Sequence, residues 1–128
     1  MTFHLEPRPR VGIVGTGGIS RSHARGWRAL HADIHVFSSQ GAEDFAAQFA
    51  PVTIHDSFES LLEAVDVIDV CTPTPSHPEY VHAALDRGTH VLCEKPLALS
   101  SREATRMAEH AREAGLLLFP AHVVRFFP

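Results

Sequence analysis

Six residues near the start of the chain have the pattern of a nucleotide-binding turn: Gly15-Thr16-Gly17-Gly18-Ile19-Ser20. In such a turn the first glycine permits a tight bend after a strand, and the second lets backbone amides approach a pyrophosphate. The helix that begins there directs its N–H groups and its dipole at the anion. Ser20 stands where a third glycine is usual, and so small a side chain still allows the helix to pack closely on the strand. The turn therefore predicts a dinucleotide site.

Taken alone, this turn leaves two other interpretations open. A turn that only joins a strand to a helix has the same pattern, and so does a methyltransferase that binds S-adenosylmethionine. A P-loop is excluded, because no Gly-Lys-Ser or Gly-Lys-Thr follows.

The loop after the second expected strand bears on the choice of cofactor. A carboxylate there would hold the adenosine ribose and favour NAD, but Ser38 and Ser39 occupy the loop and the first acid is Glu43. Without the acid, a 2′-phosphate meets no repulsion, yet the loop has no lysine or arginine to bind it. Arg21, early in the first helix, is the basic residue that we consider for this contact. The choice between NAD and NADP stays open, and the missing acid also argues against a methyltransferase.

A second candidate segment is the loop that contains Thr72, Pro73 and Thr74, followed by His77. Ligands of open α/β sheets bind outside the carboxyl ends of the strands, so this loop should face the cofactor. The prolines fix its backbone, and the threonines offer hydroxyl groups. The competing interpretation is a rigid turn capped by Ser76, with His77 exposed in the first turn of a helix.

The third candidate segment is Glu94-Lys95-Pro96, which follows a buried strand. An ammonium group donates hydrogen bonds to a hydroxyl or carbonyl oxygen and stabilises negative charge that develops during hydride transfer. Lys95 is therefore our candidate catalytic residue. The competing interpretation is an ion pair between Glu94 and Lys95 at the surface, which would contribute little to stability.

Short apolar runs alternate with segments of helical spacing along the whole chain. The strand-like runs are at residues 11–14, 34–37, 52–55, 67–71, 90–93 and 116–119, and the last resumes at 122–126. The helical segments are at residues 19–30, 42–49, 56–65, 76–88 and 100–115. Strict alternation predicts right-handed crossovers and a parallel sheet. We expect one α/β domain over residues 1–128: a doubly wound, mostly parallel six-stranded sheet with helices on both faces, as in the Rossmann fold.

Three pairs of residues have the spacing of a capping box, in which a short polar side chain caps a helix and an acid follows three residues later. They are Asp56 with Glu59, Ser76 with Glu79, and Ser100 with Glu103. Gly88 and Gly115 are placed to end the helices that the last two pairs begin.

Composition excludes several classes of protein. The 128 residues carry a formal charge of −4 without a basic stripe, so nucleic acid is not an expected partner. No apolar run is long enough to cross a membrane, and residues 1–10 lack the apolar core of a signal peptide, so we expect a cytoplasmic protein. Cys71 and Cys93 end apolar runs and should be buried and reduced. The histidines are scattered, so we expect no metal site.

The glycine turn, the Thr72-Pro73 loop with His77 and above all Glu94-Lys95-Pro96 resemble the Gfo/Idh/MocA family of oxidoreductases. Residues 121–128 also resemble the family's stretch that leads out of the nucleotide-binding domain. The resemblance implies hydride transfer between NAD(P) and a sugar, polyol or related alcohol. It implies that Lys95 contacts the reacting oxygen, that Glu94 and the loop from Thr72 to Thr74 line the cofactor cleft, and that Arg125 lies near the nicotinamide.

The family also has a C-terminal α+β domain that supplies the substrate pocket, commonly an acid–base histidine, and the sheet through which its members form homo-oligomers. That domain lies outside these 128 residues, so we expect the cofactor-holding part of a longer enzyme, not catalytically complete alone. The alternatives are a stand-alone nucleotide-binding or regulatory module, and a remnant that folds but binds nothing.

Overall fold

The computed structural model describes residues 7–128, and within them the chain alternates strand and helix throughout. The strands are β1 (Arg10–Val14), β2 (Asp33–Phe37), β3 (Val52–Ile54), β4 (Val67–Val70), β5 (His90–Glu94) and β6 (Leu118–Ala121). The α-helices are α1 (Gly18–Ala29), α2 (Ala42–Gln48), α3 (Phe58–Ala64), α4 (His77–Asp86) and α5 (Ser101–Ala114). Two short 3₁₀ turns, η1 (Thr74–Ser76) and η2 (Val123–Phe126), complete the described elements.

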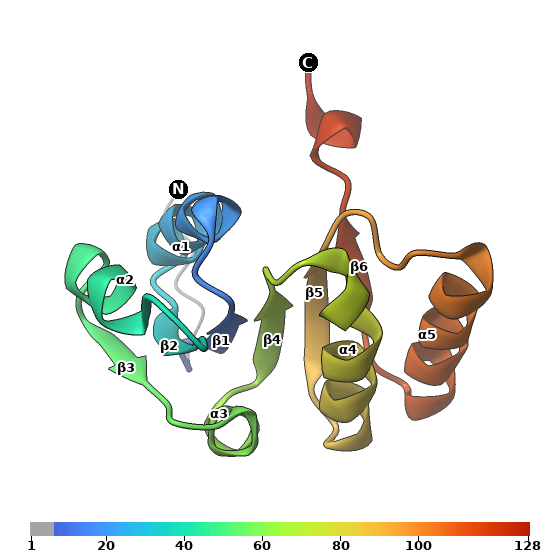
Figure 1. Cartoon of the computed structure of the whole chain (residues 1–128), viewed down its shortest axis with the longest axis horizontal. Coiled ribbons are helices and arrows are strands. Elements are labelled where there is room, and N and C mark those ends of the chain that lie inside the picture. Colours follow the sequence, from blue (N-terminus) through green and yellow to red (C-terminus); the bar gives the residue numbers. More distant parts are fainter. Residues whose placement is uncertain (1–6) are drawn as a thin grey trace.

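The strands form one six-stranded sheet in the order β3-β2-β1-β4-β5-β6, and every pair is parallel. This order confirms the predicted doubly wound sheet. From β1 the connections run toward β3, whereas from β4 they run toward β6, so the direction reverses between β1 and β4 (Figure 1). A ligand of such a sheet binds where this reversal parts the loops.

Two apolar cores cover the two faces of the sheet, and β1 contributes to both. Val11 and Ile13 pack in the core shared with α1 and α2, whereas Val14 packs in the core shared with α3, α4 and α5. This alternation follows from the two-residue period of a strand. Helices therefore lie on both faces, as expected.

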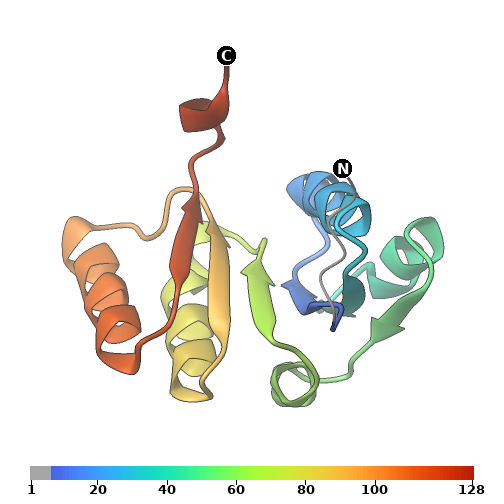
Figure 2. The same ribbon diagram turned by 180° about the vertical axis from the view of Figure 1, so that it is seen from behind.

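Helices α1 and α2 cover only part of their face of the sheet (Figure 2). Figure 2 shows β5 and β6 with no helix in front of them. A groove of about 350 Å³ lies there, lined by His23 and by mostly apolar residues of these strands, of α1 and of η2. Phe119 on β6 is 51% exposed in this groove.

Helix capping agrees with the sequence at one of the three predicted boxes. Ser100 caps α5, and its hydroxyl accepts from the Glu103 N–H at 3.2 Å. The box at Asp56 was wrong, because Ser57 takes the N-cap position and accepts from the Ser60 N–H at 3.1 Å.

Ser76 occupies the N-cap position of α4 as predicted, but the box was wrong, because its hydroxyl makes no cap bond and lies 2.7 Å from Thr72 Oγ1 and from Pro73 O. Gly88 and Gly115, at φ +77° and +69°, follow α4 and α5 as predicted.

The chain leaves the sheet sooner than the sequence predicts. Strand β6 ends at Ala121, and the expected strand at residues 122–126 is instead the turn η2. Its backbone bonds are local, from Arg125 N to His122 O and from Phe127 N to Val124 O. The segment protrudes beyond the sheet (Figure 1), and within residues 7–128 it pairs with no strand.

Three further predictions concern membrane-spanning segments, a signal peptide and the two cysteines. In the part that the structure describes, no helix is both long enough and apolar enough to span a bilayer. The absence of a signal peptide was predicted from residues 1–10, and residues 1–6 lie outside the described part. Cys71 and Cys93 are buried and unpaired, as expected.

Replacement of Gly12 should destabilise the fold. A Cβ atom there would lie 2.8 Å from Leu61 Cγ and 3.0 Å from Ile68 Cδ1, so Gly12→Ala should lower the free energy of unfolding by about 1 to 3 kcal/mol. Gly26→Ala is the matched control, because nothing lies within 4 Å of its added Cβ in helix α1, and it should stabilise by about 0.5 to 1 kcal/mol. Urea unfolding followed by Trp27 fluorescence measures both. A Gly12→Ala protein as stable as the wild type would contradict this packing.

Candidate functional site

The turn from β1 into α1 needs glycine at its first position. Gly15 has φ +90°, and its N–H donates to Phe37 O at the end of β2, at 3.0 Å. A Cβ atom at Gly15 would lie 3.0 Å from Thr72 Cγ2 and 3.1 Å from the Cys71 backbone. Gly15 thus lets the carboxyl ends of β1, β2 and β4 meet closely.

The N-terminus of α1 is left open to an anion. Gly17 is its N-cap and makes no side-chain cap, and the first turn of α1 has no acidic residue. Added Cβ atoms at Gly17 and Gly18 would meet nothing within 4 Å. The first N–H groups of a helix have no acceptor within the helix, so they are available to a ligand here. Ser20 is fully buried against the sheet, which confirms that this small residue permits close packing.

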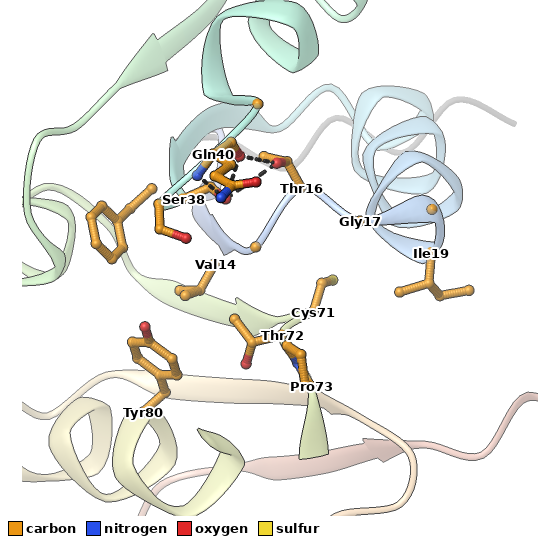
Figure 3. Close-up of a pocket in the computed structure, with 15 residues that line it drawn as sticks. Val14, Thr16, Gly17, Ile19, Ser38, Gln40, Cys71, Thr72, Pro73 and Tyr80 are labelled. Atoms are coloured by element: carbon orange, nitrogen blue, oxygen red, sulfur yellow. Dashed lines mark hydrogen bonds between the residues drawn. The ribbon is translucent and has the colours of Figure 1, made fainter. Parts of the chain in front are cut away.

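A pocket of about 730 Å³ opens at the point where the strand order reverses (Figure 3). Its lining contains most of the predicted cofactor residues: Gly15, Thr16, Gly17, Gly18, Ile19, Ser38, Ser39, Thr72 and Pro73. It also contains residues that the sequence analysis did not select: Val14, Phe37, Gln40, Gly41, Cys71 and Tyr80. Gln40 and Gly41 follow the serine pair directly and were within reach of a sequence argument. Tyr80 comes from α4 across the pocket, and no local pattern indicates that position.

The loop after β2 is held to the glycine turn by hydroxyl groups. Thr16 Oγ1 lies 2.6 Å from Gln40 O and 3.2 Å from Ser38 Oγ, and Ser38 Oγ donates to Gln40 O at 2.7 Å (Figure 3). None of the described residues that line this pocket is charged. Arg21 lies outside the lining, where its guanidinium donates to Thr16 O at 3.1 Å and to Gln48 Oε1 at 3.0 Å.

His77 connects the loop that contains Thr72 to the loop that contains Pro96. Its side chain is 1% exposed, so the alternative of an exposed first-turn residue was wrong. Its Nε2 lies 2.8 Å from Thr72 O, and its Nδ1 lies 2.9 Å from Pro96 O. His77 and Thr74 both lie outside the lining of the large pocket, although the loop that His77 supports provides Thr72 and Pro73.

Glu94 and Lys95 are not a surface ion pair. The Glu94 side chain is buried, with Oε1 2.8 Å from His23 Nε2 and Oε2 accepting from the Lys95 backbone N–H at 3.0 Å. Lys95 is exposed, and the peptide bond to Pro96 is cis. Lys95 and Arg125 line a second cavity of about 500 Å³, which η2 helps to form. The structure therefore brings these two predicted residues together.

A buried cluster centred on His23 connects α1 to the ends of two strands. His23 Nδ1 lies 2.9 Å from both oxygens of Asp69 on β4, and Trp27 Nε1 donates to Asp69 Oδ2 at 2.7 Å. The sequence analysis missed this cluster. Its only local signal is Asp69 itself, the single acid in an otherwise apolar strand.

Hydrogen bonds among the side chains of this cluster account for its arrangement without a metal ion. Ligand atoms of His23, Asp69 and Cys71 lie within 4.8 Å of one another, a spacing that a metal ion could use. However, both nitrogens of His23 already face carboxylates, and burial raises the pKa of the Cys71 thiol far above its ordinary value. We therefore interpret the group as hydrogen-bonded side chains.

His23 is held in its protonated form. Burial of the ring lowers its pKa, but the hydrogen bonds and negative charges of Asp69 and Glu94 outweigh this effect and raise the pKa to about 9. An imidazolium donates from both nitrogens, whereas neutral histidine donates from one. The protonated ring thus satisfies both carboxylates at neutral pH.

Comparisons with known proteins agree with this geometry. Residues 9–122 match the Gfo/Idh/MocA family, described as an oxidoreductase family with an NAD-binding Rossmann fold. Among characterised proteins, D-xylose 1-dehydrogenase (NADP⁺) 2 of Haloferax volcanii is 34% identical in an alignment of 125 positions, which covers 91% of this chain and 38% of that protein. This chain thus spans about two-fifths of the length of that relative.

Two solved structures are similar over most of the chain. UDP-N-acetylglucosamine 3-dehydrogenase from Acidithiobacillus ferrooxidans superposes with a TM-score of 0.88 at 32% identity, covering 94% of this chain and 40% of that one. The WlbA dehydrogenase from Chromobacterium violaceum, in complex with NADH and UDP-GlcNAcA, gives a TM-score of 0.81 at 26% identity. This match covers 92% of this chain and 36% of that one.

The stability that His23 provides should depend on pH. Its pKa is raised from 6.5 to about 9, so the contribution is complete below pH 6.5 and is lost as the pH rises to about 9. The difference in unfolding free energy between wild type and His23→Gln should fall by about 3 kcal/mol between pH 6 and pH 9.5. Urea titrations at the two pH values measure it. A difference that stays constant with pH would show that His23 is not charged in the folded protein.

Proposed function

Because the chain belongs to the Gfo/Idh/MocA oxidoreductase family, we propose that it binds a nicotinamide dinucleotide across the carboxyl ends of β1, β4 and β5 and directs the nicotinamide toward Lys95. The observation that carries this proposal is the pocket at the strand reversal. The uncapped N-terminus of α1 opens into this pocket, and glycine residues and hydroxyl side chains line its walls.

The residues present fit this group along its length. The hydroxyl-rich loop at Ser38 suits an adenosine ribose, and the open space beside Gly17 and Gly18 suits a pyrophosphate against the start of α1. Thr72 and Pro73 form the opposite wall. The pocket and the Lys95 cavity both lie at the carboxyl ends of the strands. A dinucleotide bound in the pocket therefore directs its nicotinamide end toward the Lys95 cavity.

Lys95 is the residue that we propose for the chemistry. The bound cofactor supplies or accepts the hydride. Lys95 is exposed in its cavity, where its ammonium donates a hydrogen bond to the oxygen of the reacting alcohol or carbonyl and stabilises negative charge there. Arg125, in the same cavity, adds a second positive charge toward an anionic or polar substrate.

We further propose that the substrate is a sugar, a polyol or a related alcohol. Support comes from the relatives, whose names specify D-xylose and UDP-N-acetylglucosamine dehydrogenation. Since the chain spans about 38% of the first of them, we propose that turnover and homo-oligomer formation need the remaining part of such a protein. A cytoplasmic location stays a prediction.

Cofactor binding tests the proposal directly. We expect saturable binding of NADH or NADPH to the chain, measured by calorimetry or by quenching of Trp27. Gly17→Ala places a methyl group in open space where the pyrophosphate should approach, so it should weaken binding by roughly tenfold or more without destabilising the fold. Gly26→Ala, also on α1 but outside this pocket, should leave affinity unchanged. If neither dinucleotide binds, the chain is a remnant and the proposal fails.

The uncharged adenosine end should discriminate weakly between the two cofactors. With neither a carboxylate nor a basic group in the lining, we expect the dissociation constants of NADH and NADPH to lie within about tenfold of each other, or about 1.4 kcal/mol. Ser38→Asp should favour NADH by a further tenfold or so, because the carboxylate repels a 2′-phosphate. Ser101→Asp, at the start of α5 and outside this pocket, is the control. A strong preference in the wild type would contradict this account.

A further inference from the structure

His23 connects the two halves of the proposed cofactor site. It lies in α1, the helix that begins at the glycine turn, and it faces Glu94, the residue before Lys95. The path is short: Lys95 N–H donates to Glu94 Oε2 at 3.0 Å, and Glu94 Oε1 lies 2.8 Å from His23 Nε2. One imidazole ring thus connects the helix that follows the glycine turn to the residue before Lys95.

The other contacts of the ring hold it in place. Asp69 is fully buried and contacts His23 Nδ1, while it also accepts from Trp27 Nε1. The Trp27 contact already joins α1 to β4. The contact of His23 with Glu94 therefore adds something different, because it extends this link to the end of β5 and to the backbone of Lys95.

The charges also favour a fixed geometry. Two buried carboxylates share one ring, and each has a nitrogen of that ring within 2.9 Å. Separation of one partner from such a buried group leaves an uncompensated charge, so a rearrangement of these side chains costs stability. Glu94 is thereby restrained at both of its oxygens.

We propose that His23 is a positioning residue, which fixes the carboxylate of Glu94 and through it the backbone of Lys95, so that the nicotinamide end of a bound dinucleotide meets the lysine. This inference rests on the proposed function. It predicts that His23 matters for the nicotinamide half of the ligand and not for the ADP-ribose half.

The composition of the chain supplies two probes for a test. Lys95 is the only lysine in the sequence, and Trp27 is the only tryptophan. Reductive methylation with ¹³C-formaldehyde therefore gives a single lysine signal, which comes from Lys95. Trp27 fluorescence reports on the cluster from its other side, through the hydrogen bond to Asp69.

The experiment compares the tighter-binding dinucleotide, NADH or NADPH, with the matching fragment that lacks nicotinamide, ADP-ribose or its 2′-phosphate. In His23→Gln we expect the fragment to bind within about twofold of wild type, the dinucleotide to bind about tenfold more weakly, and the Lys95 signal of the complex to shift. Glu94→Gln keeps the contacts of His23 and Trp27 with Asp69, so it provides the same test if His23→Gln does not fold. Equal loss for both ligands, or loss for neither, would overturn the inference.

A double-mutant cycle separates positioning from a general structural role. If His23 acts through Glu94, the double variant should lose no more than about twofold beyond the weaker-binding single variant. Losses that multiply would overturn the proposed path. His82→Gln, which disrupts a histidine pair between α4 and α5 at 2.7 Å, should leave the Lys95 signal and both affinities unchanged. Failure of the wild type to bind either ligand would overturn the proposed function, and this inference with it.

Discussion

The chain connects β1 to strands on one side of the sheet and β4 to strands on the other side. The candidate site depends on this reversal of direction between β1 and β4. Loops that follow neighbouring strands normally crowd each other, but here the loops after β1 and β4 part and leave a pocket. The same topology puts the start of α1 beside that pocket. Gly15 makes the arrangement feasible, because its missing side chain lets the β1 turn lie against Cys71 and Thr72.

The second constraint is electrostatic. Asp69 sits in a row of the sheet with Ile13 on one side and Leu92 on the other, where an unpaired carboxylate would cost several kcal/mol. His23 and Trp27 satisfy it from α1, and His23 also satisfies Glu94. Helix α1, which follows the glycine turn, is therefore attached to β4 and to the end of β5, directly before Lys95. One ion cluster thus joins the two segments that we propose for cofactor binding and for the chemistry.

Local patterns in the sequence were sufficient for most of the fold and for the glycine residues that line the pocket. The alternation of strands and helices, the turn at Gly15 and the Ser100 cap depend on residues close in the chain, and the structure contains each of them. The binding of a pyrophosphate at this turn stays a prediction. The Asp56 box failed because the neighbouring Ser57 takes the cap position, and the Ser76 box failed because the Ser76 hydroxyl bonds to Thr72 and Pro73 instead. The His23 cluster joins residues 46 and 71 positions apart, so only the folded sheet reveals it. The same is true of Tyr80, and of His77, whose buried bridge between loops resembles an exposed helix start in the sequence.

The most direct test of this account is a crystal structure of the chain with its tighter-binding reduced dinucleotide. We expect the pyrophosphate within hydrogen-bonding distance of the backbone amides of Gly17, Gly18 and Ile19. We also expect the adenosine ribose against Ser38 and the nicotinamide ring nearest to Lys95. A pyrophosphate bound away from the glycine turn, or a nicotinamide directed away from Lys95, would contradict it.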